Sequence, residues 1–359
     1  MYETEVFSEY PRKETEMNRA GMGLVLGLVV LAGCFSNDWE VSEKGNAVVL
    51  NGAGATFPSP VYSVWAFHFT ESTDRQVQVN YQGVGSGAGV NQLKEGTIDF
   101  AGSDSPLQAD ELEKDGLAQF PMLAGGVVVV LNVPGMTDGA CRLPADVLAD
   151  IFLGKITKWN DPRIVAANPD GKLPDLDITV VYRADSSGTS FLFTHYLTQV
   201  SPPWAEKVGA GAAVRFPVGI GGQKNPGVCN NVAKISGAIG YTEYSYALET
   251  GLACASLQNA AGKFVAPSVA SFTEALKNAD WEKAPGFYMI LTNAAGENSY
   301  PITGITYLLY RKNLDETKKS ALWRYVDWCF TGGKFKAREL HYVPIPEEVV
   351  EKIQEIQHP

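Results

Sequence analysis

Three short stretches decide the fold of this chain: VVLNGAGATFP at residues 48–58, NYQGVGSG at 80–87 and DFAGSD at 99–104. Each joins an apolar, strand-like run to a turn that is rich in glycine or hydroxyl side chains. Helix-like patterns at residues 58–69 and 90–94 lie between them. The order strand, turn, helix, strand and turn predicts an α/β fold, with a parallel sheet and ligand groups at the carboxyl ends of its strands.

The same pattern continues further along the chain. Residues 127–131 are wholly apolar and follow Gly125-Gly126, which predicts a buried central strand and a place where the chain could cross between domains. Residues 178–182 and 305–310 are further strand candidates. With 359 residues, the chain is long enough for two domains.

The composition argues against several classes of function. The formal net charge is -11 and no basic stretch is present, so nucleic acid is not an expected partner. An anion site in such a chain has to rely on local dipoles and a few cations. The histidines are scattered and there is no CxxC or Cys/His cluster, so we expect neither a metal site nor a cofactor.

Residues 1–33 are predicted to be a leader. Arg19 precedes an apolar run at 21–33, which is too short to span a bilayer and ends just before Cys34. Small residues before a cysteine resemble a bacterial lipoprotein signal, in which Cys34 becomes the lipid-bearing first residue. The alternative is a plain secretory signal followed by a coincidental cysteine. Either signal exports the protein.

The other cysteines can form disulfides in an exported protein. Four cysteines allow three full pairings, and the sequence alone does not decide between them. If a bridge forms, the pair nearest in sequence is the one we favour, Cys229 with Cys254. The four are Cys141, Cys229, Cys254 and Cys329.

Two of the glycine-rich turns offer donors to an anion. Turns that run into helices present backbone N–H groups and hydroxyls, and the helix dipole favours negative charge there. Thr56 offers a hydroxyl, Phe57 a backbone N–H and Ser86 a second hydroxyl. A plainer reading makes Thr56 a helix cap. The segment around Ser86 also fits the dinucleotide pattern G-x-G-x-x-[GA], although an exported protein has little access to nicotinamide cofactors.

The richest segment is RADSSGT at residues 183–189. Arg183 can make bidentate bonds to an oxyanion, and Asp185 can hold its guanidinium in place. The alternative is an N-capped helix that follows a surface salt bridge. The remaining donors are hydroxyl and N–H groups at a helix start, from Ser187, Gly188 and Thr189.

Asp104 gives this anion site a specific chemical meaning. It follows a strand, in a Gly-Ser-Asp-Ser-Pro turn. A carboxylate among donors that surround an anion requires the ligand to carry a proton, which the carboxylate can accept in a hydrogen bond. The alternative is a solvated turn aspartate or an Asx-turn before Pro106.

Serine hydrolysis is not supported by these motifs. A nucleophile elbow needs glycine two residues before and two residues after the serine. Val84, Ala101 and Asp185 stand two residues before the three candidate serines, which are Ser86, Ser103 and Ser187. We therefore expect a binding protein and not an enzyme.

Together these motifs resemble the phosphate-binding proteins of bacterial ABC phosphate importers (the Pst system), from about residue 48 to about residue 350. LGKITKW at 153–159, GAIGY at 237–241 and YPIT at 300–303 add to the resemblance. It implies a two-lobed periplasmic-binding-protein fold of type II, with two crossovers and the ligand in the cleft. The implied boundaries are 47–124 plus 300–359 for lobe I and 127–292 for lobe II.

The resemblance also implies the function and the ligand contacts. The protein would bind inorganic phosphate, as HPO4 or H2PO4, and deliver it to the membrane subunits of an ABC permease. It would act as a monomer in the periplasm or on the outer face of the cytoplasmic membrane, anchored by a lipid on Cys34. The implied contacts are Thr56, Phe57, Ser86, Asp104, Arg183, Ser187, Gly188 and Thr189, with Asp185 holding Arg183.

Three rival functions and two departures from the family pattern stand beside this interpretation. A binder of another protonated oxyanion such as arsenate, an exported phosphatase-like enzyme, and a scaffold lipoprotein that reuses the fold are the rival functions. Gly87 stands where some family members have a second serine, and the four mature cysteines are not general in the family.

Overall fold

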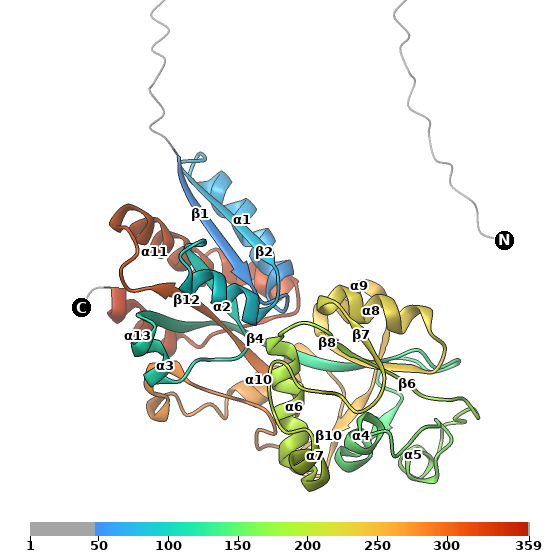
Figure 1. Ribbon diagram of the computed structural model, residues 1–359. Coiled ribbons are helices and arrows are strands. Elements are labelled where there is room, and N and C mark those ends of the chain that lie inside the picture. Colours follow the sequence, from blue (N-terminus) through green and yellow to red (C-terminus); the bar gives the residue numbers. More distant parts are fainter. Residues whose placement is uncertain (1–46, 358–359) are drawn as a thin grey trace, which may run out of the picture. The chain divides into compact units, whose positions relative to one another are not determined.

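The computed structural model describes residues 47–357, and a mixed sheet runs through them in the order β2-β1-β3-β12-β4-β8-β6-β7 (Figure 1). The described residues belong to one compact unit. The predicted leader and Cys34 lie outside the described residues. Of the helices in residues 47–357, none combines the length and the apolar character that crossing a bilayer requires.

The first part of the sheet has the parallel arrangement that the sequence predicts. Strand β1 (Val48–Gly54) pairs in parallel with β2 (Val77–Gly83) and β3 (Phe100–Ser103). Helices α1 (Ser59–Ser72) and α2 (Ser86–Lys94) connect these strands. The carboxyl ends of the three strands therefore meet at one edge of the sheet, where the three glycine- and hydroxyl-rich turns lie.

Strand β4 (Leu117–Leu131) joins the two parts of the sheet. Nine of its first ten residues pair with β12 (Thr303–Arg311), and its last five pair with β8 (Ala238–Glu243). The partner changes between Gly126 and Val127, within the predicted crossing region. A Cβ on Gly126 would lie 2.2 Å from the ring of Phe272, so the close packing at this point requires glycine.

The sequence analysis predicted only the last third of β4, residues 127–131, as a strand. Residues 117–126 contain Pro121 and the Gly-Gly pair, which are uncommon inside a strand. In the structure, Pro121 lies at a bulge, because the register shifts between Thr306 and Tyr307 of β12. A proline is tolerated at such a position because the ladder is already interrupted there. The pairing does not decide which residues belong to lobe I or lobe II, so those boundaries stay a prediction.

The second part of the sheet is again parallel. Strand β6 (Thr179–Arg183) pairs with β7 (Ile220–Gly222) and β8. Helices α6 (Gly188–Val200), α8 (Lys224–Lys234) and α9 (Tyr244–Thr250) follow β6, β7 and β8 in turn. Figure 1 shows α8 and α9 beside β7 and β8, on the opposite side of β4 from β1 and β2.

The remaining elements are short or peripheral to the site. They are β5 (Arg142–Leu143), β9 (Ala253–Cys254), β10 (Ser256–Gln258), β11 (Phe264–Val265), β13 (Val343–Pro344), α3 (Ala109–Lys114), α4 (Ala145–Phe152), α5 (Pro162–Ala167), α7 (Pro202–Lys207), α10 (Val269–Leu276), α11 (Glu316–Phe330), α12 (Gly333–Glu339), α13 (Glu347–Gln357) and the 3-10 turns Trp281–Lys283 and Pro285–Phe287.

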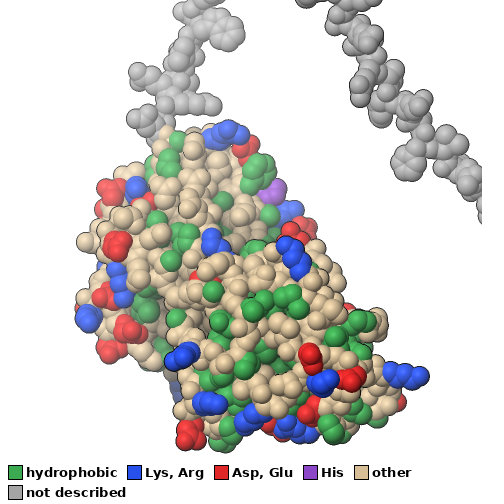
Figure 2. All heavy atoms as spheres, turned by 45° about the vertical axis from the view of Figure 1, so that its right-hand side comes forward, with side chains coloured by type: hydrophobic (Ala, Val, Ile, Leu, Met, Phe, Trp, Pro, Cys, Tyr) green, Lys and Arg blue, Asp and Glu red, His purple; other side chains and the backbone are tan. Residues whose placement is uncertain are grey.

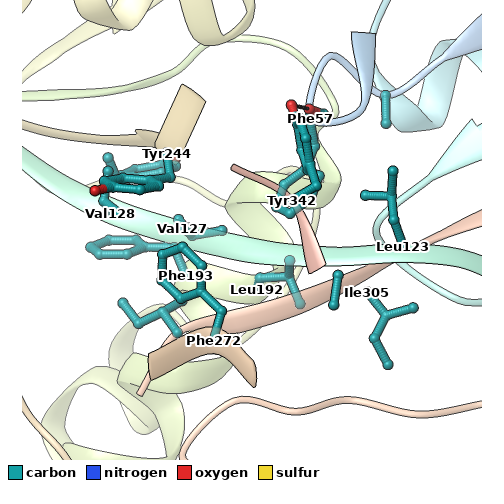
Figure 3. Packing of buried hydrophobic residues seen from close by; sticks show 14 of the residues in the cluster. Phe57, Leu123, Val127, Val128, Leu192, Phe193, Tyr244, Phe272, Ile305 and Tyr342 are labelled. Carbon is teal, nitrogen blue, oxygen red and sulfur yellow. Dashed lines mark hydrogen bonds between the residues drawn. The ribbon is translucent and has the colours of Figure 1, made fainter. Parts of the chain in front are cut away.

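One apolar core surrounds β4 and includes residues from both parts of the sheet. Val127 and Val128 of β4 lie among large side chains such as Phe193 and Phe272 (Figure 3). Burial of this apolar area stabilises the fold by about 25 cal/mol per Å². On the face shown in Figure 2, acidic and basic side chains are interspersed rather than gathered into a patch of one sign.

The expected disulfide is wrong in this structure. Cys141, Cys229, Cys254 and Cys329 are all free and buried. The Cys229 sulfur lies 3.5 Å from Thr242 Oγ1, and the Cys254 sulfur lies 3.9 Å from the Leu252 carbonyl oxygen.

Candidate functional site

The structure brings together the predicted ligand contacts and Asp185. The β1–α1 turn carries Thr56 and Phe57, α2 begins with Ser86, Asp104 follows β3, and Arg183 ends β6. The segment 187–189 begins α6. These residues are buried. The exposed fraction of each residue is at most 5%, for Thr56, Phe57, Ser86, Asp104, Arg183, Ser187 and Thr189.

Gly188 is the point where three of these segments meet. Its N–H donates a hydrogen bond to Ser86 Oγ at 3.0 Å. A Cβ on Gly188 would lie 2.7 Å from Ser86 Oγ, 2.7 Å from Asp104 Oδ2 and 2.6 Å from Asp104 Cβ. Only glycine therefore lets the start of α6 approach both side chains so closely.

The Arg183 guanidinium is fixed from two sides. Its Nε and Nη2 donate to the two carboxylate oxygens of Asp185 at 2.9 and 2.6 Å, and its Nη1 donates to Asn225 Oδ1 at 3.0 Å. A guanidinium has five N–H groups, so these three bonds leave one on each terminal nitrogen. Such a pair of N–H groups matches two oxygens of one oxyanion.

Asp185 has the electrostatic role that the sequence predicts. Burial alone would raise the pKa of its carboxyl, but hydrogen bonds and the charge of Arg183 lower it below its ordinary value. The ion pair is nearly inaccessible to water on the arginine side, where 1% of the side chain is exposed. The surface salt bridge of the alternative is therefore wrong, whereas its capped helix is confirmed, because Ser187 Oγ accepts from the Ser190 N–H at 3.2 Å at the start of α6.

Asp104 is half-partnered. Its Oδ1 accepts a hydrogen bond from Thr306 Oγ1 at 2.8 Å, whereas Oδ2 has no partner among the described residues. Burial raises the pKa of this carboxyl to about 7, against the opposing effects of the Thr306 hydroxyl and the Arg183 charge. The alternative of a solvated turn aspartate is wrong, because only 1% of Asp104 is exposed.

Two further polar atoms at the site lack a partner within residues 47–357. They are the Thr189 hydroxyl oxygen and the Asn225 side-chain nitrogen, both fully buried. A buried polar group without a hydrogen bond costs free energy, so several of them in one place point to a ligand that completes their bonds. No group of three His, Cys, Asp or Glu in the described part of the chain is arranged to hold a metal ion.

The glycines around Ser86 have packing roles. A Cβ on Gly89 would lie 2.4 Å from Gly54 Cα, and a Cβ on Gly87 would lie 2.2 Å from Ser186 Oγ. These glycines let α2 pack against β1 and against the 183–189 turn. The Gly87 N–H donates to the Ser186 carbonyl oxygen at 3.3 Å, so the 183–189 turn occupies the start of α2, where the dinucleotide alternative would place a pyrophosphate.

Three residues of the site were missed by the sequence reasoning. Thr306 lies in an apolar strand, and no local pattern marks it. Asn225 and Tyr246 lie in the first turns of α8 and α9, where the Asn225 N–H reaches Thr56 Oγ1 at 3.4 Å and the Tyr246 hydroxyl reaches the Thr56 carbonyl oxygen at 2.7 Å. The Gly-Gly turn before Asn225 was a usable signal of the same kind as the others.

Comparison with known proteins agrees with this arrangement. The family model described as the PBP superfamily domain matches residues 41–331. The phosphate-binding protein PstS of Pasteurella multocida is 49% identical over 309 residues, 86% of this chain and 89% of that protein. The protein of the same name from Xylella fastidiosa is 46% identical over 314 residues, 87% of this chain and 86% of that one.

A solved structure shares the fold. The ancestral soluble variant of the human phosphate-binding protein gives a TM-score of 0.69 at 21% identity, covering 86% of this chain and 93% of that one. The mixed α/β periplasmic-binding-protein fold expected from the sequence is thereby confirmed. The chain belongs to the family of phosphate-binding proteins named PstS, within the PBP superfamily.

Proposed function

We propose that this protein binds inorganic phosphate outside the cytoplasm and delivers it to the membrane subunits of an ABC permease. It is a binding component of a transporter and not an enzyme. One observation carries the proposal: a single buried site pairs the half-partnered carboxylate of Asp104 with the guanidinium of Arg183, which retains two N–H groups.

The proposed ligand contacts are mostly donors. Arg183 offers its two remaining N–H groups, and the start of α6 offers backbone N–H groups at the positive end of a helix dipole. Asp104 is the acceptor, and Asp185 holds Arg183. The full set is Thr56, Phe57, Ser86, Asp104, Arg183, Ser187, Gly188 and Thr189.

Selectivity follows from the proton of the ligand. Phosphate at neutral pH keeps at least one proton, which can be donated to Asp104 Oδ2. Sulfate keeps none, so opposite the ionised carboxylate it would place an oxygen lone pair against a buried negative charge, at a cost of several kcal/mol, on the order known for unpaired buried polar groups. Because burial raises the Asp104 pKa to about 7, this discrimination is fullest above that pH. Selectivity then comes partly from a repulsive element. Arsenate also carries a proton and would be accepted by the same argument.

The anchor, the oligomeric state and the lobes are further parts of the proposal. Cys34 would carry the lipid, and residues 47–124 plus 300–359 would close on residues 127–292 around the ligand. The protein would be a monomer.

Mass spectrometry of Cys34 in membrane fractions tests the anchor, and release of a Cys34→Ser variant into solution is the expected result. Light scattering tests the monomer, and small-angle scattering with and without phosphate tests closure.

The experiment that tests the function is calorimetric titration with phosphate and then with sulfate. The titrated sample is a shortened form without residues 1–34, which is first unfolded and refolded to remove bound ligand. Tight binding of phosphate without heat from sulfate is the expected result at a pH well above 7, where Asp104 is ionised. A folded sample that binds no phosphate would refute the proposal and leave the similarity as one of fold alone.

A further inference from the structure

The peptide group between Thr56 and Phe57 is held by a side chain from a distant helix. The Tyr246 hydroxyl, on α9, donates to the Thr56 carbonyl oxygen at 2.7 Å. The Ser59 N–H also donates to this oxygen, at the longer distance of 3.2 Å. Tyr246 is buried, and burial raises the pKa of its phenol, so the hydroxyl remains a donor at physiological pH.

This bond determines the direction of the Phe57 N–H. In a trans peptide the C=O and N–H of one peptide group point in opposite directions, and the described chain has no cis peptide bonds. A donor fixed on the Thr56 oxygen therefore fixes the Phe57 N–H on the opposite side. The Phe57 N–H finds no acceptor within the described residues.

The same turn is tied to the elements that carry the arginine. The Asn225 N–H donates to Thr56 Oγ1 at 3.4 Å, and Asn225 Oδ1 accepts from Arg183. The next carbonyl, that of Phe57, accepts from the Tyr342 hydroxyl at 2.7 Å (Figure 3). Successive carbonyls of the turn are thus held by tyrosine hydroxyls. Of these two tyrosine bonds, the one from Tyr246 acts on the peptide group that contains the Phe57 N–H.

We propose that Tyr246 is a positioning residue, whose hydroxyl orients the Phe57 N–H toward the bound oxyanion and ties the β1–α1 turn to α9. The proposal rests on the proposed function, in which this N–H is a ligand contact. Tyr246 itself does not touch the ligand. It acts by making one donor ready before the ligand arrives and by keeping the turn in place afterwards, so its loss accelerates release.

The test is Tyr246→Phe in the full chain, which removes one oxygen atom. We expect the Kd for inorganic phosphate to rise about tenfold, mostly through faster dissociation, as loss of one hydrogen bond of about 1.4 kcal/mol requires. The matched control is Tyr196→Phe, which removes a buried hydroxyl that donates to the Gln258 carbonyl at 3.0 Å, away from the turn. The control should keep the phosphate affinity and rates of the parent protein.

A second readout separates orientation from general loosening. With 15N-phenylalanine labelling, the Phe57 amide proton should shift downfield when phosphate binds to the parent protein and to Tyr196→Phe, and shift less in Tyr246→Phe. If Tyr246→Phe folds poorly, hydrogen exchange of the parent protein takes the place of the variant's NMR measurement. The Phe57 amide should then become protected from exchange only when phosphate is added.

The outcomes are distinguishable. A parent protein that does not bind phosphate defeats the proposed function. A parent protein that binds phosphate while Tyr246→Phe keeps the same Kd, dissociation rate and Phe57 shift defeats only the role of Tyr246. Equal losses in Tyr246→Phe and Tyr196→Phe also defeat it, because they indicate a structural effect. If hydrogen exchange shows that the Phe57 amide is already protected without phosphate, the role of Tyr246 is also defeated.

Discussion

Asp104 and Glu243 are two buried carboxyls that end strands of the same sheet, yet their surroundings differ. Only 1% of Asp104 and 0% of Glu243 is exposed, and burial raises their pKa values to about 7 and about 8. The Glu243 carboxyl accepts from the Ser245 N–H and from the Ser245 hydroxyl, and it lies 3.0 Å from the Tyr342 hydroxyl. Asp104 has one oxygen with a partner and one without.

The difference separates a structural carboxyl from a ligand-binding one. The Tyr342 hydroxyl has a single proton, and it lies within hydrogen-bond distance of both the Phe57 carbonyl and Glu243. A protonated Glu243 can donate to the Tyr342 oxygen, so that Tyr342 donates to Phe57 and every partner is satisfied. Asp104 faces the charge of Arg183 instead, and its free oxygen can be satisfied only by something that carries a proton.

Arg183→Ala is the largest change that tests this comparison. Removing the cation should weaken phosphate binding by about a thousandfold, because two charge-assisted hydrogen bonds of about 2 kcal/mol each are lost. Calorimetric titration measures the effect. Arg163→Ala is the control, since Arg163 pairs with Asp150 at the surface. If the Kd of Arg183→Ala for phosphate stays within about threefold of the parent value, the site lies elsewhere.

The residues around Arg183 show which part of the site the sequence could predict. Arg183, Asp185 and the donors at 187–189 lie within one turn and one helix start, so local rules for capping, dipoles and ion pairs were sufficient. The glycine turns after β1 and β2 were predictable for the same reason, since parallel strands bring their carboxyl ends together.

Long-range partners were beyond the sequence. Thr306 lies 202 positions from Asp104, and Tyr246 lies 190 positions from Thr56. Nothing local distinguishes them from other residues of an apolar strand or of a helix. Glu243 was missed because a carboxyl at a strand end is usually solvated, and only the packing of Tyr342 against it reveals its burial. The disulfide was wrong because proximity in sequence carries no information about the direction of a side chain.

Asp104→Asn is the next largest change. We expect phosphate binding to weaken by about a hundredfold and sulfate binding to strengthen, because the amide can donate to an oxyanion but accepts its proton less well than a carboxylate does. Titrations with both anions give the ratio of affinities, which should fall. An unchanged ratio would show that selectivity does not come from this carboxyl, and the contrast with Glu243 would lose its functional meaning.

The pH dependence of sulfate binding sharpens the comparison further. Protonated Asp104 can donate to sulfate, and the raised pKa of this carboxyl places its titration at about 7. Above that pH the protonated fraction falls, so sulfate affinity should drop about tenfold per pH unit and should level off below it. Sulfate titrations between about pH 6 and about pH 9 measure the slope. Asp104→Asn should remove the slope, and a parent protein without one would contradict the assignment.

Glu243→Gln should have the smallest effect on ligand affinity, within about threefold, because the glutamine amide can donate to Tyr342 while its oxygen accepts from Ser245. Its effect should appear in stability. Because the folded-state pKa of Glu243 is raised from 4.5 to about 8, the folded protein holds a proton that the unfolded chain releases. The free energy of unfolding of the parent protein therefore falls as pH rises from about 4.5 to about 8, by on the order of a few kcal/mol, and then becomes level.

In Glu243→Gln the free energy of unfolding should fall less as the pH rises from about 4.5 to about 8. The difference in free energy of unfolding between the variant and the parent protein should therefore grow across this pH window and remain constant above it. Urea unfolding at both ends of the window measures the gain. Asp104 titrates with the same sign in an overlapping range, because burial raises its pKa from 3.8 to about 7. The comparison is therefore repeated in an Asp104→Asn background, where any remaining fall belongs to Glu243. If Glu243→Gln has the same pH profile as its parent in that background, Glu243 is ionised in the folded protein, and the proton that we place between it and Tyr342 is absent.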